Sequence, residues 1–160
     1  MAMNLIVGQS GGPTAVINSS LAGVYETAKN LGVNKVYGML YGIEGLLQEK
    51  MVDLDDMLGD IMSIELLKRT PSSYLGSCRC KLPTPEQDES VYDTLFRLFD
   101  KYEIGALLYI GGNDSMDTIA KLSAYGARIR SKVRFIGVPK TIDNDLMLTD
   151  HTPGYGSAAK

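Results

Sequence analysis

The sequence predicts an α/β protein, a Rossmann-like three-layer α/β/α sandwich with a mostly parallel sheet. Three observations predict this fold. Runs of apolar and β-branched residues, such as residues 106–110 and 133–138, are typical of strands buried in a parallel sheet. Segments with an apolar residue every three or four positions, typical of amphipathic helices, alternate with these runs. The resulting order β-α-β-α-β-α-β indicates helices on both faces of the sheet.

The composition is that of one ordinary soluble domain. The chain has 160 residues, of which 44% are hydrophobic and 22% are charged, and its net charge is −3. Because it has no cluster of Lys and Arg to attract nucleic acid or anionic membranes, we expect neither as a partner. No apolar run approaches the ~20 residues of a membrane span, and the first residues lack the pattern of a signal peptide. With two cysteines and no disulfide framework, a cytoplasmic location is expected.

The first third of the chain predicts two strands and one helix. Residues 4–7 predict the first strand, and residues 8–13 form a glycine-rich turn after it. A helix with one apolar face follows, and Gly32 is placed to end it. That face consists of Ile17, Leu21, Val24, Ala28 and Leu31. Residues 35–39 predict the second strand, whereas residues 41–60 are punctuated by glycine and stay unassigned.

The rest of the chain predicts three helices and two strands. A short helix over residues 61–69 ends at the Thr-Pro pair that follows it. After a loop at residues 70–84, Thr84 caps a helix with Pro85 at its first position and Gln87 three residues after the cap, the arrangement of a capping box. The apolar stripe of that helix consists of Val91, Leu95, Leu98, Phe99 and Tyr102. The remaining elements are a strand at residues 106–110, a helix at 114–125 and a strand at 133–138.

Three polar turns leave three of the predicted strands, at residues 8–13, 111–115 and 139–145. Because the carboxyl ends of parallel strands meet at one edge of a sheet, we expect the three turns to lie together where such sheets bind ligands. Glycines let the backbone approach a phosphate, and a helix that opens after such a turn attracts anions to its N-terminus. The first two turns are expected to open helices in this way. Neither has the spacing of a Walker A loop or of a dinucleotide-binding loop.

The third turn carries groups that phosphoryl transfer requires. Asp143 and Asp145 are two residues apart, so in an extended segment both face the same way. One carboxylate is able to accept a proton while the other helps to place a metal ion or water, and Lys140 supplies a positive charge beside them. Asn113 and Asp114 of the second turn are able to reach Mg²⁺, which prefers oxygen ligands.

With these residues assembled, the chain resembles the N-terminal part of a phosphofructokinase over essentially all of its length. The motifs that carry the resemblance are Ser10-Gly11-Gly12 followed by Asn18, residues 41–46 (YGIEGL), residues 75–79 (LGSCR), residues 111–115 (GGNDS) and residues 140–145 (KTIDND). The last of these motifs is highly specific to the family. The resemblance implies a phosphotransferase of glycolysis that acts on the 1-hydroxyl of fructose 6-phosphate. It also implies a homo-oligomer, a dimer or a tetramer, when the protein is full length.

The resemblance also implies roles for single residues. Asp143 matches the catalytic base of the family, and Arg79 matches an arginine near the transferred group. The residues that match sugar contacts are Thr141, Ile142 and Asp143. The residues assigned to the phosphates of the donor are Gly11, Gly12, Arg79 and Gly112.

Two residues distinguish the possible phosphoryl donors. Members that use ATP resemble Gly-Gly-Asp-Gly-Ser in the second turn and carry a glycine before Thr-Ile-Asp, whereas this chain has Asp114 and Lys140 at these positions. That pairing resembles the pyrophosphate-dependent branch. A carboxylate at Asp114, where the family places the α-phosphate of the nucleotide, repels ATP, and Lys140 offsets charge on the transferring phosphoryl. The expected donor is therefore pyrophosphate with Mg²⁺, and Asp143, Lys140 and Asp114 are the expected catalytic residues.

One position departs from the family pattern. Asn113 stands where many members carry an aspartate associated with Mg²⁺, and it keeps a ligating oxygen but loses the charge. Asn113 and Asp145 are the expected metal ligands. The resemblance further implies that residues 1–150 form a domain that binds the phosphoryl donor and that residues 151–160 begin a truncated sugar-phosphate-binding domain. Because Ser157 is expected to cap a helix there, the chain is interpreted as the front piece of a longer protein.

Other interpretations of the same residues stay open. Asp143 and Asp145 are able to cap a loop, and Gly11 and Gly12 to form a tight turn without a ligand. Lys140 is able to lie in solvent, and Asp114 to cap its helix. The alternative functions are an ATP-dependent phosphofructokinase, an isolated non-catalytic phosphate-binding domain and a dinucleotide-binding domain.

Overall fold

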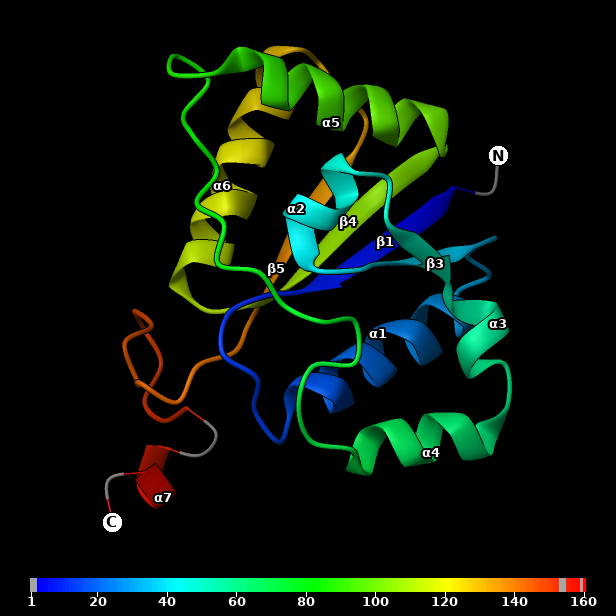
Figure 1. The fold of residues 1–160 in the computed structure, drawn as a ribbon, viewed down its shortest axis with the longest axis vertical. Helices are drawn as coiled ribbons and strands as arrows, with labels where there is room; N and C mark the ends of the chain where they lie inside the picture. The colour runs from blue at the N-terminus through cyan, green and yellow to red at the C-terminus, as the bar shows by residue number, and fades with distance from the viewer. Residues whose placement is uncertain (1–2, 153–154, 159) are drawn as a thin grey trace.

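A five-stranded sheet forms the centre of the molecule, seen in a computed structural model that describes residues 3–152, 155–158 and 160 (Figure 1). The strand order is β3-β2-β1-β4-β5. The parallel strands are β1 (Asn4–Gln9), β2 (Val36–Met39), β4 (Ile104–Gly111) and β5 (Arg134–Pro139). At one edge β3 (Met51–Asp53) pairs antiparallel with β2. The mostly parallel sheet predicted from the sequence is confirmed.

Helices cover both faces of this sheet (Figure 1). One face carries α2 (Gly42–Leu47), α5 (Glu89–Lys101) and α6 (Asn113–Arg128). The opposite face carries α1 (Ile17–Asn30), α3 (Leu54–Leu58) and α4 (Ile61–Arg69). Because successive residues of a strand point to opposite faces, Ile6 packs with the first group of helices, whereas Leu5 and Val7 pack with the second. The predicted three-layer α/β/α sandwich is therefore confirmed.

Most predicted elements lie within a few residues of their predicted bounds. The helix α4 has the predicted bounds, and α1 ends just before Gly32, whose φ of +74° is the left-handed conformation that glycine favours. The unassigned residues 41–60 contain α2, β3 and α3, which are between three and six residues long. The two helices are shorter than two turns and the strand has three residues. Such short elements contain too few apolar positions to show a helical or strand periodicity in the sequence.

The start of α5 differs from the prediction. The helix begins at Glu89, and the Asp88 carboxylate accepts a hydrogen bond from the Ser90 amide (3.1 Å). The Gln87 side chain does accept a hydrogen bond from the Thr84 amide (2.9 Å), as in a capping box, but this bond closes a turn before the helix. The prediction was wrong because the chain has two possible helix caps, Thr84 and Asp88. The second cap stands directly before the residues that pack on the sheet, and the helix begins there.

The strand β5 is more exposed than its apolar sequence predicts. It lies at an edge of the sheet, where α6 packs on one of its faces. Phe135 faces that helix, whereas Ile136 on the other face is 46% exposed. Leu31, predicted to belong to the apolar face of α1, follows the end of that helix and is 79% exposed. With Val24 and Val138 these two exposed side chains line an apolar groove beside α1.

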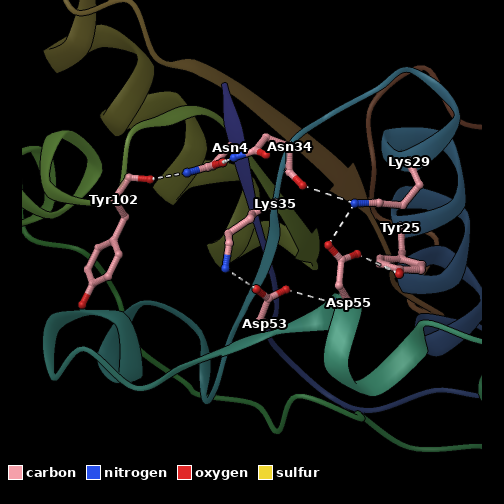
Figure 2. Close-up of polar contacts among 8 residues, drawn as sticks. All are labelled: Asn4, Tyr25, Lys29, Asn34, Lys35, Asp53, Asp55 and Tyr102. Atoms are coloured by element: carbon pink, nitrogen blue, oxygen red, sulfur yellow. Dashed lines mark hydrogen bonds and ion pairs between the residues drawn. The ribbon is translucent and has the colours of Figure 1, made fainter. Parts of the chain in front are cut away.

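Polar side chains join several elements at the amino-terminal edge of the sheet (Figure 2). The Asn4 side chain donates to the Tyr102 carbonyl (2.8 Å) and accepts from the Asn34 side chain (3.0 Å). Lys29 of α1 pairs with Asp55 of α3 (2.9 Å). This edge lies opposite to the three polar turns, so these contacts hold the layers together without taking part in the turns.

The last described helix is α7 (Tyr155–Ala158). It includes Ser157, so the prediction that Ser157 caps a helix was wrong. Ala159, which would lie in the first turn of a helix capped at Ser157, is outside the described residues. Among the described residues, no helix has both the length and the apolar character that crossing a membrane requires.

Candidate functional site

The three polar turns meet at the carboxyl edge of the sheet, as the sequence predicts. Together with residues 78–80 they enclose a cavity of about 370 Å³. Its lining consists of Ser10, Gly11, Gly12, Cys78, Arg79, Cys80, Gly112, Asn113, Asp114, Ser115, Lys140, Thr141, Asp143 and Asp145. All of the predicted site residues except Ile142 are in this lining.

Glycine shapes the turn that follows β1. Gly11 has φ of +77°, a conformation that residues with a Cβ rarely adopt, and its amide donates to the Cys78 carbonyl (3.4 Å). Gly12 is exposed, and a Cβ there would meet no other atom. The turn does not open directly into a helix as expected, because α1 begins later, at Ile17.

The second turn does lead directly into a helix. Gly112 is the N-cap of α6, so the interpretation of Asp114 as the cap is wrong, and Asp114 lies instead in the first helical turn. The Ser115 amide donates to the Gly112 carbonyl (3.0 Å), whereas the Asn113 and Asp114 amides have no preceding turn to bond to. Together with the helix dipole, these two amides favour an anion. The turn is tightly packed, since a Cβ on Gly111 would lie 2.6 Å from the Cβ of Ser115.

Lys140 is buried at the junction of the three turns, with 7% of its surface exposed. Its amide donates to the Gly111 carbonyl (2.7 Å), and its ammonium group donates to the Gly12 carbonyl. Burial lowers the pKa of Lys140 below its usual value, and the charge of Asp143 opposes this shift. The alternative of a solvated surface lysine is therefore wrong.

The segment after Lys140 presents alternate side chains to the cavity. Thr141 is buried, and its hydroxyl accepts a hydrogen bond from the Asp143 amide (3.1 Å), which fixes a local turn. The Asp143 side chain lines the cavity and is exposed to solvent. Ile142 is 40% exposed, and the structure does not bring it into the cavity.

Asn113 and Asp145 join the second turn to the third. The Asn113 side chain donates to the Asp145 carboxylate. Asn144 has φ of +54°, and its side-chain oxygen accepts a hydrogen bond from the Thr152 amide (2.9 Å), which folds the chain back after the third turn. Asp143 and Asp145 both line the cavity, whereas Asn144 does not. The segment is not extended as the prediction assumed, because it bends at residues 142–143 and Asn144 has a left-handed backbone, so strand-like alternation does not explain the placement of the two carboxylates.

Further positive charge comes from the segment after Cys78, whose Arg79 lines the cavity. Arg79 is exposed, and no carboxylate of the described residues forms an ion pair with it. The Lys81 ammonium nitrogen lies 3.5 Å from Oδ1 of Asp114. Both of these side chains are exposed, so this ion pair is weak.

Four lining residues had no predicted role: Ser10, Cys78, Cys80 and Ser115. Ser10 and Cys78 are buried, and the Ser10 hydroxyl donates to the Cys78 carbonyl (3.1 Å). Burial raises the pKa of the Cys80 thiol, so this group stays protonated near neutral pH. Each of the four is adjacent in sequence to a predicted site residue. That adjacency is the one feature of the sequence from which they could have been predicted.

The oxygen atoms of the cavity suit a hard cation. Asp114, Asp143 and Asp145 contribute carboxylates, and Asn113 contributes an amide. The described residues hold no group of three or more His, Cys, Asp and Glu side chains close enough to bind a metal by themselves. Because Mg²⁺ usually takes one or two carboxylates and completes its shell with water and phosphate oxygens, this set fits an ion that is shared with a phosphate ligand.

Known proteins are similar to this chain in sequence and in fold. Residues 4–160 match the family described as phosphofructokinase. The chain belongs to the phosphofructokinase family. It is 43% identical over 157 residues to the pyrophosphate–fructose 6-phosphate 1-phosphotransferase of Rhodospirillum rubrum, a match that covers 98% of this chain and 37% of that protein. It is 33% identical over 150 residues to the ATP-dependent 6-phosphofructokinase of Clostridioides difficile, covering 93% of this chain and 42% of that protein.

A solved phosphofructokinase has the same fold. The crystal structure of the pyrophosphate-dependent phosphofructokinase from Nitrosospira multiformis matches with a TM-score of 0.89 at 40% identity, covering 100% of this chain and 39% of that one. The predicted resemblance to phosphofructokinases is therefore confirmed. The chain spans between 37% and 42% of the length of these three relatives.

Proposed function

We propose that the full-length protein transfers a phosphoryl group from Mg-pyrophosphate to the 1-hydroxyl of fructose 6-phosphate. The products are fructose 1,6-bisphosphate and phosphate. The observation that carries this proposal is the buried ammonium group of Lys140, held at a glycine-lined cavity that Asp114 also faces. Relatives named for pyrophosphate, at 43% and 40% identity, support it.

Asp143 is the proposed general base. The sugar oxygen forms a bond to phosphorus, the bond from phosphorus to the leaving phosphate breaks, and the hydroxyl proton passes to the Asp143 carboxylate. The hydrogen bond from the Asp143 amide to the Thr141 hydroxyl supports this role, because it fixes the backbone from which the carboxylate reaches the cavity. Thr141, Ile142 and Asp143 are the proposed sugar contacts, which would place the sugar along the third turn.

The donor phosphates are proposed to bind where backbone amides and cations converge. Gly11, Gly12 and Gly112 let the chain approach the phosphate oxygens, and the start of α6 adds amides and a favourable dipole. Arg79, which also lines the cavity, is proposed to bind the same phosphates. Lys140 offsets the charge that spreads over the transferring group in the transition state, where a preorganised donor is most effective.

Asp114 is proposed to select the donor. Its carboxylate lies in the first turn of α6, at the mouth of the phosphate site, and Lys81 offsets only part of its charge because both groups are exposed. A nucleotide adds a third phosphate and must place it near this carboxylate, whereas pyrophosphate needs no such contact. Repulsion of the longer donor then favours pyrophosphate.

Asn113 and Asp145 are the proposed ligands of Mg²⁺. Bound there, the ion would supply positive charge to the phosphoryl group. The hydrogen bond between them uses the Asn113 nitrogen and one Asp145 oxygen, so it leaves one oxygen of each side chain for a metal ion, and both residues line the cavity. Because Asn113 carries no charge, pyrophosphate oxygens and water are expected to complete the coordination.

We infer the domain organisation, oligomeric state and location of the full-length protein from its family membership. Residues 1–150 would form the donor-binding domain, and residues 151–160 would begin the domain that binds the sugar phosphate. The full-length protein would form a dimer or a tetramer in the cytoplasm. Light scattering of the full-length protein tests the oligomer, and a monomer would contradict it.

A coupled assay of the full-length protein with either donor tests the proposed function. We expect kcat/KM for pyrophosphate to exceed that for ATP by at least about 100-fold. A preference for ATP, as the name of the Clostridioides difficile relative describes for that protein, would replace the proposal with the ATP-dependent alternative. Binding of pyrophosphate without turnover by the intact enzyme would instead support a non-catalytic phosphate-binding module.

Exchange of Asp114 tests the donor selection. We expect Asp114→Gly to raise kcat/KM for ATP, because the repulsive carboxylate is gone. The matched control is Asp117→Gly on the same helix, which removes an exposed carboxylate that does not line the cavity. If the two variants change the use of ATP equally, Asp114 does not select the donor.

A further inference from the structure

An irregular segment brings Arg79 to the cavity, and we name residues 70–80 the strap. It leaves α4 at Thr70 and contains no helix or strand. The Gly76 amide donates to the Ser73 carbonyl (3.1 Å) and the Gly76 carbonyl accepts from the Ser73 hydroxyl (2.5 Å), whereas other backbone groups of the strap bond to residues outside it. Buried backbone groups need partners from elsewhere when no regular element supplies them. Two side chains at the carboxyl end of β1 and the start of α1 supply several of them. These are Gln9 and Asn18, both fully buried with 0% exposure.

Gln9 uses both ends of its side-chain amide. Its nitrogen donates to the Ile17 carbonyl (3.2 Å) and to the Asn18 side-chain oxygen (2.9 Å). Its oxygen accepts hydrogen bonds from the Ser73 hydroxyl (3.0 Å) and from the Leu75 amide (2.9 Å). Two donors and two acceptor positions are thus filled, which is the full capacity of this group. The end of β1 is thereby joined to the middle of the strap.

Asn18 makes the neighbouring contacts. Its nitrogen donates to the Thr70 carbonyl (2.8 Å), where the strap begins. Its oxygen accepts from the Tyr74 amide (2.9 Å) as well as from Gln9. The two amides therefore form one buried network that contacts the strap at its start and at its centre. Such a network is rigid when every member is satisfied, because any displacement leaves a buried polar group without a partner.

The strap is then joined to the glycine turn itself. The Cys78 carbonyl accepts from the Gly11 amide (3.4 Å) and from the Ser10 hydroxyl (3.1 Å). In return the Ser77 hydroxyl donates to the Gly11 carbonyl (2.5 Å). Arg79 follows at once, and its guanidinium forms no ion pair with the described residues. The contacts of the strap therefore set where the Arg79 backbone lies, and with it the part of the cavity that the guanidinium is able to reach.

We propose that Gln9 and Asn18 are positioning residues for Arg79 and that they place its guanidinium against the donor phosphates. This inference rests on the proposed function, in which Arg79 binds a phosphate. The physical reason is that an exposed arginine with no protein partner has no other restraint on where its charge lies. A shift of about 1 Å in such a group costs on the order of 100-fold in rate.

A double-mutant cycle in the full-length protein tests this coupling. It compares the wild type with Gln9→Met, Arg79→Ala and the double variant, where methionine keeps the volume of Gln9 but makes no hydrogen bonds to the strap. We expect Gln9→Met to lower kcat/KM for pyrophosphate about 10- to 100-fold in the presence of Arg79 and less than about twofold in its absence. An equal loss in both backgrounds would show that Gln9 does not act through Arg79, and would overturn the proposal.

Amide hydrogen exchange supplies a readout that is independent of catalysis. In Gln9→Met we expect faster exchange at the Leu75 and Tyr74 amides, with unchanged protection of the β4 amides, because only the strap loses its partners. Unchanged exchange at the strap, or a rise throughout the sheet, would overturn the proposal. The control is Asn4→Ala, which removes another buried side-chain amide, at the opposite edge of the sheet (Figure 2). It is expected to lower stability while leaving kcat/KM and strap exchange unchanged.

A milder variant keeps the test decisive if Gln9→Met does not fold. Ser73→Ala removes the hydroxyl that donates to Gln9 and to the Gly76 carbonyl of the strap, while Gln9 keeps its bond from the Leu75 amide. The same cycle with Arg79→Ala then applies. If the wild type does not turn over pyrophosphate, the proposed function fails, and the cycle is measured on the dissociation constant of pyrophosphate instead. If Arg79→Ala changes neither turnover nor this dissociation constant, Arg79 binds no phosphate and the positioning proposal is overturned.

Discussion

A lysine that is withdrawn from water holds its proton less tightly than a free lysine, because its charged form loses hydration. Lys140 is in this situation: it is buried, its ammonium group donates to the Gly12 carbonyl, and Asp143 offsets part of the shift. The lowered pKa of Lys140 predicts two measurable effects of pH, one on activity and one on the free energy of unfolding.

The catalytic consequence is an alkaline limit on activity. We expect kcat/KM for pyrophosphate in the full-length protein to fall as pH rises, with a midpoint below 10.5, because loss of the Lys140 proton removes the charge that faces the phosphates. In Lys140→Arg the midpoint should move upward, since a guanidinium does not lose its proton in this range. A pH profile that is the same in both proteins would assign the limit to another group.

The stability consequence has the opposite direction. Between the lowered pKa of folded Lys140 and the unfolded value of 10.5, the unfolded chain binds more protons than the folded one. The free energy of unfolding therefore rises with pH across this window. Urea unfolding at several pH values should show this rise in the wild type and a smaller rise in Lys140→Met. Equal slopes for the two proteins would contradict the lowered pKa.

The proposed role of Asp143 as general base predicts the effect of replacing its carboxylate. We expect Asp143→Asn to lower kcat of the full-length protein by at least about 100-fold, because an amide does not accept the hydroxyl proton. Asp150→Asn is the control, since Asp150 lies on the same loop and outside the cavity lining. A kcat that Asp143→Asn leaves intact would remove Asp143 from the role of base.

At the scale of elements, the start of α5 shows that capping hydrogen bonds and packing on the sheet determine different properties of a helix. The capping box at Thr84 forms its side-chain hydrogen bond, yet α5 starts only after Asp88. From that point Tyr92 and Phe99 are buried on the sheet, and their burial fixes the length of the helix. Hydrogen bonds at a cap are local, whereas the number of turns that a helix keeps depends on what it packs against.

The position of the cap can be checked by unfolding measurements. We expect Asp88→Ala to lower the free energy of unfolding by about 1 kcal/mol, because the Ser90 amide loses its acceptor. Thr84→Ala should cost less, since it keeps the backbone amide that donates to Gln87 and no helix begins there. A larger loss for Thr84→Ala would place the start of the helix where the sequence alone predicts it.

At the scale of the whole molecule, the two faces of the sheet are unequally covered. The face of α5 and α6 carries the larger aromatic cluster, whereas on the α1 face the apolar groove beside β5 leaves Ile136 half-exposed. Exposed apolar groups that adjoin one another form a surface that binds apolar molecules. This groove lies beside α1, and the cavity of the candidate site lies at the carboxyl ends of the strands.

This uneven coverage predicts a response to an apolar fluorescent dye. In the 160-residue chain we expect Ile136→Thr to reduce dye fluorescence, because it removes apolar surface from the groove while keeping a β-branched residue in the strand. Ile61→Thr is the control, since Ile61 is 80% exposed on α4, outside the groove. Equal dye fluorescence for Ile136→Thr and the wild type would contradict an accessible groove.

The sequence by itself determined the fold class, the order of the long elements and the turns that line the candidate site. It could do so because apolar periodicity, glycine and capping residues act over a few neighbouring positions. Tertiary structure alone decided the burial of Lys140, the exposure of Ile136 and the roles of Gln9 and Asn18. These depend on contacts between residues far apart in the chain, and no local pattern records them.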